Sequence, residues 1–329
     1  MSASNEFETA PVSPQNLQPA RKFAGSYAGE HVAGTEFVIG ALFVSWGVST
    51  SDLLLGLLIG NFLAVMTWGL VTAPIATDTR LTLYAYLEKI AGPGTIKLYS
   101  IVNGVLFAIL AGAMITVSAS AVRIIFDIPA QTDWYPTSIG FVAVALAVGA
   151  VVVIIAEKGF AKVAEFAEIC APWMILMFFV GALALMPSVI ERSSAINGLS
   201  SFSDFLAVAD ELIWVGGEDG VGMWTIAAFA WVANLAMHGS LGDMTLLRYA
   251  KSSKYGYFSA LGMFIGHYMA WVCAGIMGAG VALLLKTPLT QLDAGGVAFQ
   301  ALGIAGIIAV IIAGWTTSNP TIYLSLIHI

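Results

Sequence analysis

Long apolar runs alternate with short polar segments along this chain. Four runs, at 53–77, 98–122, 134–156 and 169–190, contain no charged residue, and three more, at 220–242, 255–285 and 294–323, add only His238 and His267. A helix that crosses the hydrocarbon core needs about 20 mostly apolar residues, so each run predicts a membrane span. A weaker run at 34–51, which contains Glu36, predicts an eighth span at the start of the bundle.

The positive charges are distributed unevenly between the two sides of such a bundle. With the N-terminus in the cytoplasm, the alternation of spans places ten of the 13 basic residues inside and three outside. The inside set is Arg21, Lys22, Arg80, Lys89, Lys97, Lys158, Lys162, Arg248, Lys251 and Lys254, and the outside set is Arg123, Arg192 and Lys286. Because an excess of Lys and Arg marks cytoplasmic loops, we expect a multi-pass protein of the cell membrane with a cytoplasmic N-terminus.

The composition is typical of a membrane protein and limits the classes of partner that the protein can have. Hydrophobic residues make up 59% of the 329 residues and charged residues 10%, with a net charge of −7. Soluble domains carry about 25% charged residues, so a soluble fold is excluded. The acidic balance argues against a nucleic-acid partner, and no obligate protein partner or organic cofactor is evident. Cys170 and Cys273 lie in apolar runs, where we expect buried, unpaired thiols.

Both ends of the chain are expected to lie outside the fold. Residues 1–22 are largely polar, lack the apolar core of a signal peptide, and predict a disordered cytoplasmic tail. Residues 324–329, LSLIHI, resemble the translation of a transposon end used in sequencing libraries. We therefore expect a non-native tail after Tyr323 on a C-terminally truncated chain.

The segment LAMHGSLGDM interrupts one of the most apolar runs with His238, Ser240, Asp243 and two glycines. A glycine inside a helix costs about 1 kcal/mol relative to alanine, and a carboxylate near mid-membrane costs about 2.5–3.5 kcal/mol. Such a segment persists only where the opened backbone and polar groups have partners. One interpretation is close helix packing, with Asp243 at the cytoplasmic end near Arg248. The other is a helix broken at a binding site.

A similar interruption lies five spans earlier, in GEHVAGTEFVIG, where Gly34, Thr35 and Glu36 fall in the first span. Transporters built from inverted repeats place their sites in broken helices at matching positions of the two halves, where the helix ends offer N–H groups and carbonyls to substrate and cation. A five-span repeat gives two halves of opposite topology. The expected division is a first repeat over 23–190, an extracytoplasmic loop over 191–219 and an incomplete second repeat over 220–323.

A third polar cluster, AGWTTSNPTIY, lies in the eighth span. Its hydroxyls, on Thr316 and Thr317, are hard oxygen ligands suited to a small cation. Hydroxyls in membrane helices also bond back to the preceding turn or to a neighbouring helix. The cluster by itself therefore fits either a cation site or a purely structural role.

Four stretches, LLLGLLIGNFLA, RLTLYAYLEKIAGPG, HGSLGDMTLLRYA and GWTTSNPTIY, resemble segments of the nucleobase–cation symporter family, which includes cytosine permease and hydantoin permease. The resemblance runs from about residue 32 to residue 323. It implies an all-α polytopic membrane protein with a five-plus-five inverted-repeat fold and broken spans one and six, of which about eight spans are present. It also implies symport of a nucleobase or related heterocycle with a cation, sodium or a proton.

The resemblance further implies roles for individual residues. Phe107 matches the aromatic on which the planar substrate stacks, and Thr316 and Thr317 match hydroxyls that hold sodium against span-one carbonyls, here that of Phe37. The candidate substrate contacts are Gly34, Thr35, Glu36, Asn103, Phe107, Asn234, His238, Ser240, Ser318 and Asn319.

Several positions depart from cytosine permease. The glutamine that precedes the stacking aromatic is Gly104 here, with Asn103 beside it, and the aromatic is phenylalanine. The asparagine after the threonine pair is Ser318, with Asn319 one position later. Glu36 replaces a small polar residue, and it can ligate a cation, carry a proton, contact a basic ligand or form a structural ion pair. These departures leave the identity of the substrate open.

Three functional interpretations follow. The leading one is a cation-coupled importer of a nucleobase-like heterocycle, and the second is a proton-coupled transporter of another small polar solute, coupled through Glu36. An intramembrane enzyme using His238 and Asp243 is disfavoured, because the sequence contains no HExxH and no G-x-S-x-G. His267 is expected to be a hydrogen-bonded packing residue.

Overall fold

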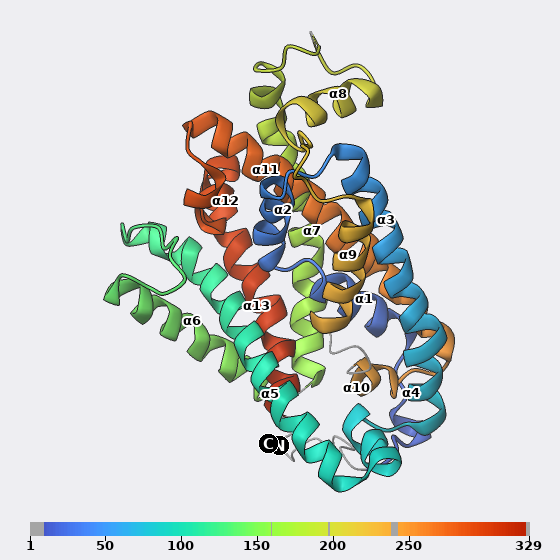
Figure 1. The fold of residues 1–329 in the computed structure, drawn as a ribbon. Helices are drawn as coiled ribbons and strands as arrows, with labels where there is room; N and C mark the ends of the chain where they lie inside the picture. Colours follow the sequence, from blue (N-terminus) through green and yellow to red (C-terminus); the bar gives the residue numbers. More distant parts are fainter. Residues whose placement is uncertain (1–9, 159, 197, 238–242, 327–329) are drawn as a thin grey trace.

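The computed structural model describes residues 10–326, except 159, 197 and 238–242, and these residues are almost entirely helical (Figure 1). The first five spans are formed by α1 (Ala20–Glu30), α2 (Thr35–Ser45), α3 (Thr50–Thr67), a π-helical turn η2 (Trp68–Thr72), α4 (Ala73–Thr79), α5 (Leu83–Ile125), α6 (Ile139–Ala156) and α7 (Phe160–Ile190). The remainder comprises α8 (Phe202–Leu212), α9 (Met223–Met237), α10 (Met244–Leu247), η4 (Ser253–Phe258), a π-helix η5 (Leu261–Tyr268), α11 (Met269–Leu285), η6 (Leu289–Gln291), α12 (Ala294–Leu302) and α13 (Ile304–Leu326).

The predicted spans correspond to these helices. Within the described ranges, six helical segments are long and apolar enough to cross a membrane, and two shorter apolar helices, Thr35–Ser45 and Met223–Leu235, belong to spans one and six. Span one is short because it is interrupted between α1 and α2. The all-α membrane fold predicted from the sequence is therefore confirmed.

Two predicted boundaries are wrong. Span one begins at Ala20 rather than near residue 34, because α1 and α2 together make it. Span eight begins at Ile304 rather than 294, because Gly303, with φ 60°, ends α12. In span three, Gly92, with φ 80° and ψ 165°, separates α5 into two helical parts, and the predicted run 98–122 lies in the second part, which follows Pro93.

The second half of the N-terminal tail is ordered, which corrects the expectation of disorder for residues 10–22. Val12 is buried, and its N–H donates to the carbonyl of Arg80 at 3.0 Å. The N–H of Gln18 donates to the carbonyl of Tyr249 at 2.8 Å. These contacts offset the entropy lost on ordering the segment.

Interactions at the two ends of the bundle agree with the predicted alternation of loops. Arg80 donates to the carbonyl of Arg248 at 3.0 Å, which joins two loops that the sequence assigns to one side. At the opposite end, the N–H of Val221 donates to the carbonyl of Trp46 at 3.2 Å. Figure 1 shows α8 at this second end and α4 and α10 at the first. Which end faces the cytoplasm stays a prediction.

Glycines let the helices approach closely. A Cβ at Gly60 of α3 would lie 2.4 Å from the carbonyl oxygen of Ala227 and 2.6 Å from the Cβ of Ala230, both on α9. Gly56, one turn earlier, is in similar contact with α9. The GxxxG pair formed by Gly56 and Gly60 therefore sets the spacing between span two and span six.

We expect Gly60→Leu to destabilise the protein by about 1–3 kcal/mol, because the new side chain overpacks the α3–α9 contact. Thermal unfolding in detergent measures the loss. Gly112→Leu on α5 is the matched control, since a Cβ there meets no atom within 4 Å. Equal melting temperatures for the two variants would show that this contact does not limit stability.

Candidate functional site

The candidate site is built around the interruption of span one. Helix α1 ends at Glu30 and α2 begins at Thr35, and the connecting residues from His31 to Gly34 are buried. The partial positive charge at the start of α2 therefore lies inside the protein. Glu36, in the first turn of α2, is fully buried and lies in this favourable position for a negative charge.

The break packs directly on span eight and span three. A Cβ at Gly34 would lie 3.1 Å from the backbone nitrogen of Gly314 on α13 and 2.9 Å from the side chain of Val117 on α5. Gly34 therefore has no room for a side chain. The contact brings the start of α2 beside the turn of α13 that carries Thr316 and Thr317, as the sequence interpretation requires.

The hydroxyls of this turn of α13 are bonded within their own helix. Thr316 and Thr317 both donate to the carbonyl of Ala313, at 3.0 and 2.7 Å, and Ser318 donates to the carbonyl of Gly314 at 2.6 Å. A hydroxyl that donates its hydrogen keeps lone pairs on oxygen. The back-bonding expected of a structural role is therefore present, and it leaves the oxygens able to ligate a cation.

Asn319 lies next to these hydroxyls and is the most unusual polar residue of α13. Its side chain is fully buried, and within the described ranges neither Oδ1 nor Nδ2 has a hydrogen-bond partner. An unpaired buried amide costs free energy, and native proteins rarely keep one without a reason. Asn319 therefore offers one donor and one acceptor group to a ligand.

A chain of buried polar side chains runs from the break across three other spans. Glu36 Oε1 lies 3.5 Å from Nε2 of His267 in η5. Nδ1 of His267 bonds to Oδ1 of Asn234 on α9, and Nδ2 of Asn234 donates to Oδ1 of Asn61 on α3 at 3.1 Å. All four side chains are fully buried. The chain joins spans one, seven, six and two.

Aromatic and imidazole rings hold His267 in place. Its ring stacks on Trp271 with centroids 4.7 Å apart and an interplanar angle of 9°. The ring of His31, from the break, lies 4.7 Å away on a tilted plane, and its Nδ1 donates to the carbonyl of Tyr27 at 2.8 Å. A Cβ at Gly266 would lie 2.6 Å from His31. This part of span seven is π-helical, a feature that often occurs at functional sites.

Other candidates are placed apart from the break. Phe107 is buried but precedes Val117 by ten residues on α5, about 15 Å at 1.5 Å per residue. Asn103 lies a further turn away, half-buried, and donates to the hydroxyl of Tyr84 at 2.6 Å. The structure therefore does not bring Phe107 or Asn103 to Gly34, because α5 is a continuous helix from these residues to Val117, the residue that contacts Gly34.

The predicted second break falls on residues 238–242, which lie outside the described residues. His238 and Ser240 lie outside the described residues, so the predicted contacts there are neither placed nor excluded. Asp243, just after this segment, caps α10, is buried, and accepts a hydrogen bond from Nε1 of Trp68 in η2. Asn234, just before it, belongs to the polar chain.

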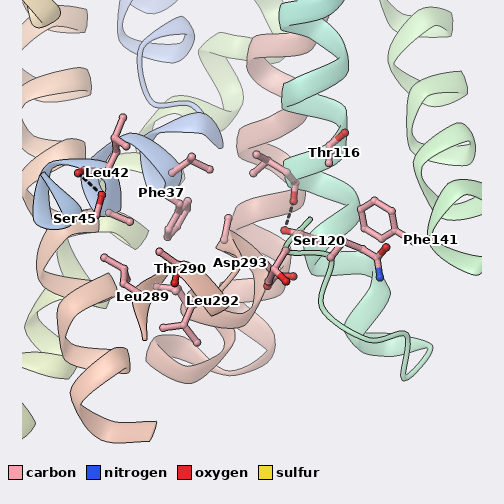
Figure 2. A pocket seen from close by; sticks show the side chains of 17 residues that line it. Phe37, Leu42, Ser45, Thr116, Ser120, Phe141, Leu289, Thr290, Leu292 and Asp293 are labelled. Carbon is pink, nitrogen blue, oxygen red and sulfur yellow. Dashed lines mark hydrogen bonds between the residues drawn. The ribbon is translucent and has the colours of Figure 1, made fainter. Parts of the chain in front are cut away.

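A cavity of about 320 Å³ lies beside the break and shares Phe37 with it (Figure 2). Figure 2 shows Phe37 and Ser45 of α2 on one side, Thr116 and Ser120 of α5 on another, and residues around Asp293 closing the third. The ring of Phe37 packs on Phe178 with centroids 4.4 Å apart. The cavity has the size of small-molecule sites and reaches the first turn of α2.

The contacts of two residues in the polar chain, His267 and Asn61, are not predicted from the sequence. His267 is buried and stacked, as the sequence predicts for a packing residue. Its position opposite Glu36 is not predicted from the sequence. An ionisable residue inside a membrane span is itself a signal of function. Asn61 had no such signal, since one asparagine in an apolar run does not disclose its partner.

We expect Asn234→Ala to destabilise the protein by about 1–3 kcal/mol for each partner left unsatisfied, since it removes the bonds to His267 and Asn61. Asn103→Ala is the control, because that side chain is half-buried and its partner is a single hydroxyl. Thermal unfolding of both variants in detergent tests this. A loss no larger for Asn234→Ala than for Asn103→Ala would contradict the importance of the chain.

No family model and no curated relative matches the sequence. Among solved structures, the fold is similar to that of Mhp1, a nucleobase-cation-symport-1 family transporter in a closed conformation with bromovinylhydantoin bound. The TM-score is 0.71 at 15% sequence identity, and the match covers 97% of this chain and 67% of that chain. The chain is therefore a multi-pass, all-helical membrane protein that shares its fold with a transporter.

Proposed function

We propose that this protein is a cation-coupled secondary transporter that imports a nucleobase or a related nitrogen heterocycle across the cell membrane by alternating access. The observation that carries the proposal is the buried break between α1 and α2, packed on the polar turn of α13. Broken helices of this kind are where inverted-repeat transporters bind their substrates. The structural likeness to Mhp1 supports the same assignment.

The substrate would lie at the interruption of span one, beside the turn of α13 that carries Asn319. The imide edge of a hydantoin or pyrimidine presents alternating acceptor and donor groups, and the unpaired amide of Asn319 matches such an edge. The cavity of about 320 Å³ lined by Phe37 and Val117 lies next to this position, because Val117 also contacts Gly34 at the break. Because Phe107 lies away from the break, we do not assign the stacking role to it.

The coupling cation would bind near the same break. Backbone carbonyl oxygens of span one around the break, with that of Phe37 as the resemblance implies, and the hydroxyl oxygens of Thr316 and Thr317 are hard ligands suited to sodium. A cation there favours the conformation in which α2 and α13 are in contact. Cation and substrate would then strengthen each other's binding, because each favours the state that the other needs.

The proposal predicts thermal stabilisation of the purified protein by one class of ring. We would screen uracil, cytosine, hydantoin and bromovinylhydantoin in detergent, with and without sodium. A ligand at a hundredfold excess over its Kd stabilises the folded state by about 2.7 kcal/mol. We expect one ring to raise the melting temperature, and to raise it more in sodium.

The double variant Thr316→Ala and Thr317→Ala should abolish the sodium-dependent part of the shift. Thr321→Ala is the matched control, because this buried threonine on the same helix also bonds back, to the carbonyl of Thr317 at 2.7 Å. A folded protein that no ring stabilises in either cation would refute the substrate class. A sodium effect that survives in the double variant would refute the proposed cation site.

A further inference from the structure

The hydrogen bonds of the polar chain fix which nitrogen of His267 carries hydrogen. Asn61 bonds to the carbonyl of Leu57 at 2.8 Å, and Asn234 bonds to the carbonyl of Ala230 at 2.6 Å. A carbonyl only accepts, so each of these bonds must come from the amide nitrogen. The remaining oxygen of Asn61 therefore accepts from Asn234, and the remaining oxygen of Asn234 faces His267.

This orientation determines the state of the imidazole. Because Oδ1 of Asn234 can only accept, Nδ1 of His267 must carry a hydrogen and donate it. In a neutral imidazole, Nε2 then presents a lone pair. That lone pair faces Oε1 of Glu36 at 3.5 Å. If the carboxylate were ionised and the imidazole neutral, two electron-rich atoms would face each other in a fully buried site.

One added proton removes this conflict. Placed on Nε2, it makes an imidazolium opposite a carboxylate, and placed on Glu36, it makes a neutral carboxyl that donates to Nε2. Without it, a buried carboxylate has only the hydroxyl of Thr35 at 3.4 Å, and its Oε2 has no hydrogen-bond partner within the described ranges. The positive end of α2 compensates this charge only in part, and a buried charge without an ionic partner is strongly destabilising inside a membrane protein.

We propose that Glu36 and His267 together bind one proton, and that this proton is a coupling ion of the transport cycle. The second half of the proposal rests on the proposed function. The pair spans two elements that meet at the break, α2 and the π-helical η5, so any separation of spans one and seven would divide the pair. The proton would then leave with the conformational change, which links protonation to the state of the transporter.

The side chains around Glu36 and His267 are compatible with one added proton. From the break, His31 contributes a second imidazole 4.7 Å from His267, and its own Nδ1 donates to Tyr27. α9 and α3 present the non-titrating amides of Asn234 and Asn61, and the hydroxyl of Tyr268 donates to the carbonyl of Leu54 at 3.2 Å. From α7, the ring of Phe178 packs on Phe37, the residue after Glu36 in α2. Two adjacent imidazolium ions would repel each other, so a proton on His267 disfavours one on His31.

The first experiment counts protons taken up by the purified chain in lipid nanodiscs between about pH 9 and pH 5, the range in which a histidine–carboxyl pair titrates. Infrared difference spectra report carboxyl and imidazole protonation directly. Relative to wild type, we expect Glu36→Gln and His267→Gln each to take up one proton fewer. The double variant should also take up only one proton fewer. This non-additive loss is the signature of a shared proton. Losses that add to two, or no loss in Glu36→Gln, would overturn the proposal.

Asp243→Asn is the matched control, because it removes another buried carboxyl whose partner is Trp68 rather than His267. It should leave the Glu36-dependent signal unchanged. Wild-type protein gives a check that needs no variant. Because the folded state favours the protonated pair, thermal stability should be full at low pH and should fall as the pH rises and the proton leaves. A melting temperature that does not fall with rising pH would contradict the proposal.

A transport experiment separates the proton site from the proposed function. Proteoliposomes carrying a pH-sensitive dye would receive an inward gradient of bromovinylhydantoin. We expect internal acidification with wild-type protein, and hydantoin uptake without acidification for Glu36→Gln, whose amide can donate permanently to Nε2. Uptake without acidification in wild type would refute coupling. If no hydantoin enters, the substrate assignment fails, while the proton count still decides the shared site.

Discussion

A polar group buried within a membrane protein must find its partner inside the protein, and the rest of this structure depends on that constraint. Interrupting span one opens a helix and buries Glu36 at its broken end. The break persists because three other spans supply His267, Asn234 and Asn61 in an unbroken sequence of contacts. The polar chain is therefore also a structural tie between spans one, two, six and seven.

Close backbone contacts make that tie possible. Gly34 meets Gly314 where neither position has room for a side chain, and Gly262 and Gly266 give space to His31. Gly60 brings α3 against α9, which aligns Asn61 with Asn234. Because each asparagine also bonds to the carbonyl one turn before it, its amide orientation is fixed. Small residues thus set the distances on which the polar contacts depend.

The same arrangement places two kinds of ligand chemistry near one break. The hydroxyls of Thr316 and Thr317 lie on the α13 side, and the carboxyl–imidazole pair of Glu36 and His267 lies on the side of span seven. Both sides contact the short segment between α1 and α2. A movement of that segment would change both at once, which is the physical requirement for coupling an ion to a transported solute.

The sequence alone determined the membrane class, the approximate spans and the interruption of span one, because apolar runs and glycine-rich polar breaks are local properties. It also named Glu36, Thr316 and Thr317 as candidate ligands; all three are buried, and their roles stay predictions. It failed where the outcome depended on long-range contacts: residues 10–22 are ordered by partners near Arg80 and Tyr249.

Only the tertiary structure decided which polar residues meet. Asn61 and His267 are more than 200 residues apart in sequence, yet one amide of Asn234 connects them. Phe107, matched by resemblance, lies about 15 Å along α5 from Val117, which contacts Gly34 at the break, because ten residues of continuous helix separate the two. An apolar run indicates that a polar residue within it is buried, but the partner of that residue depends on how the helices pack in three dimensions.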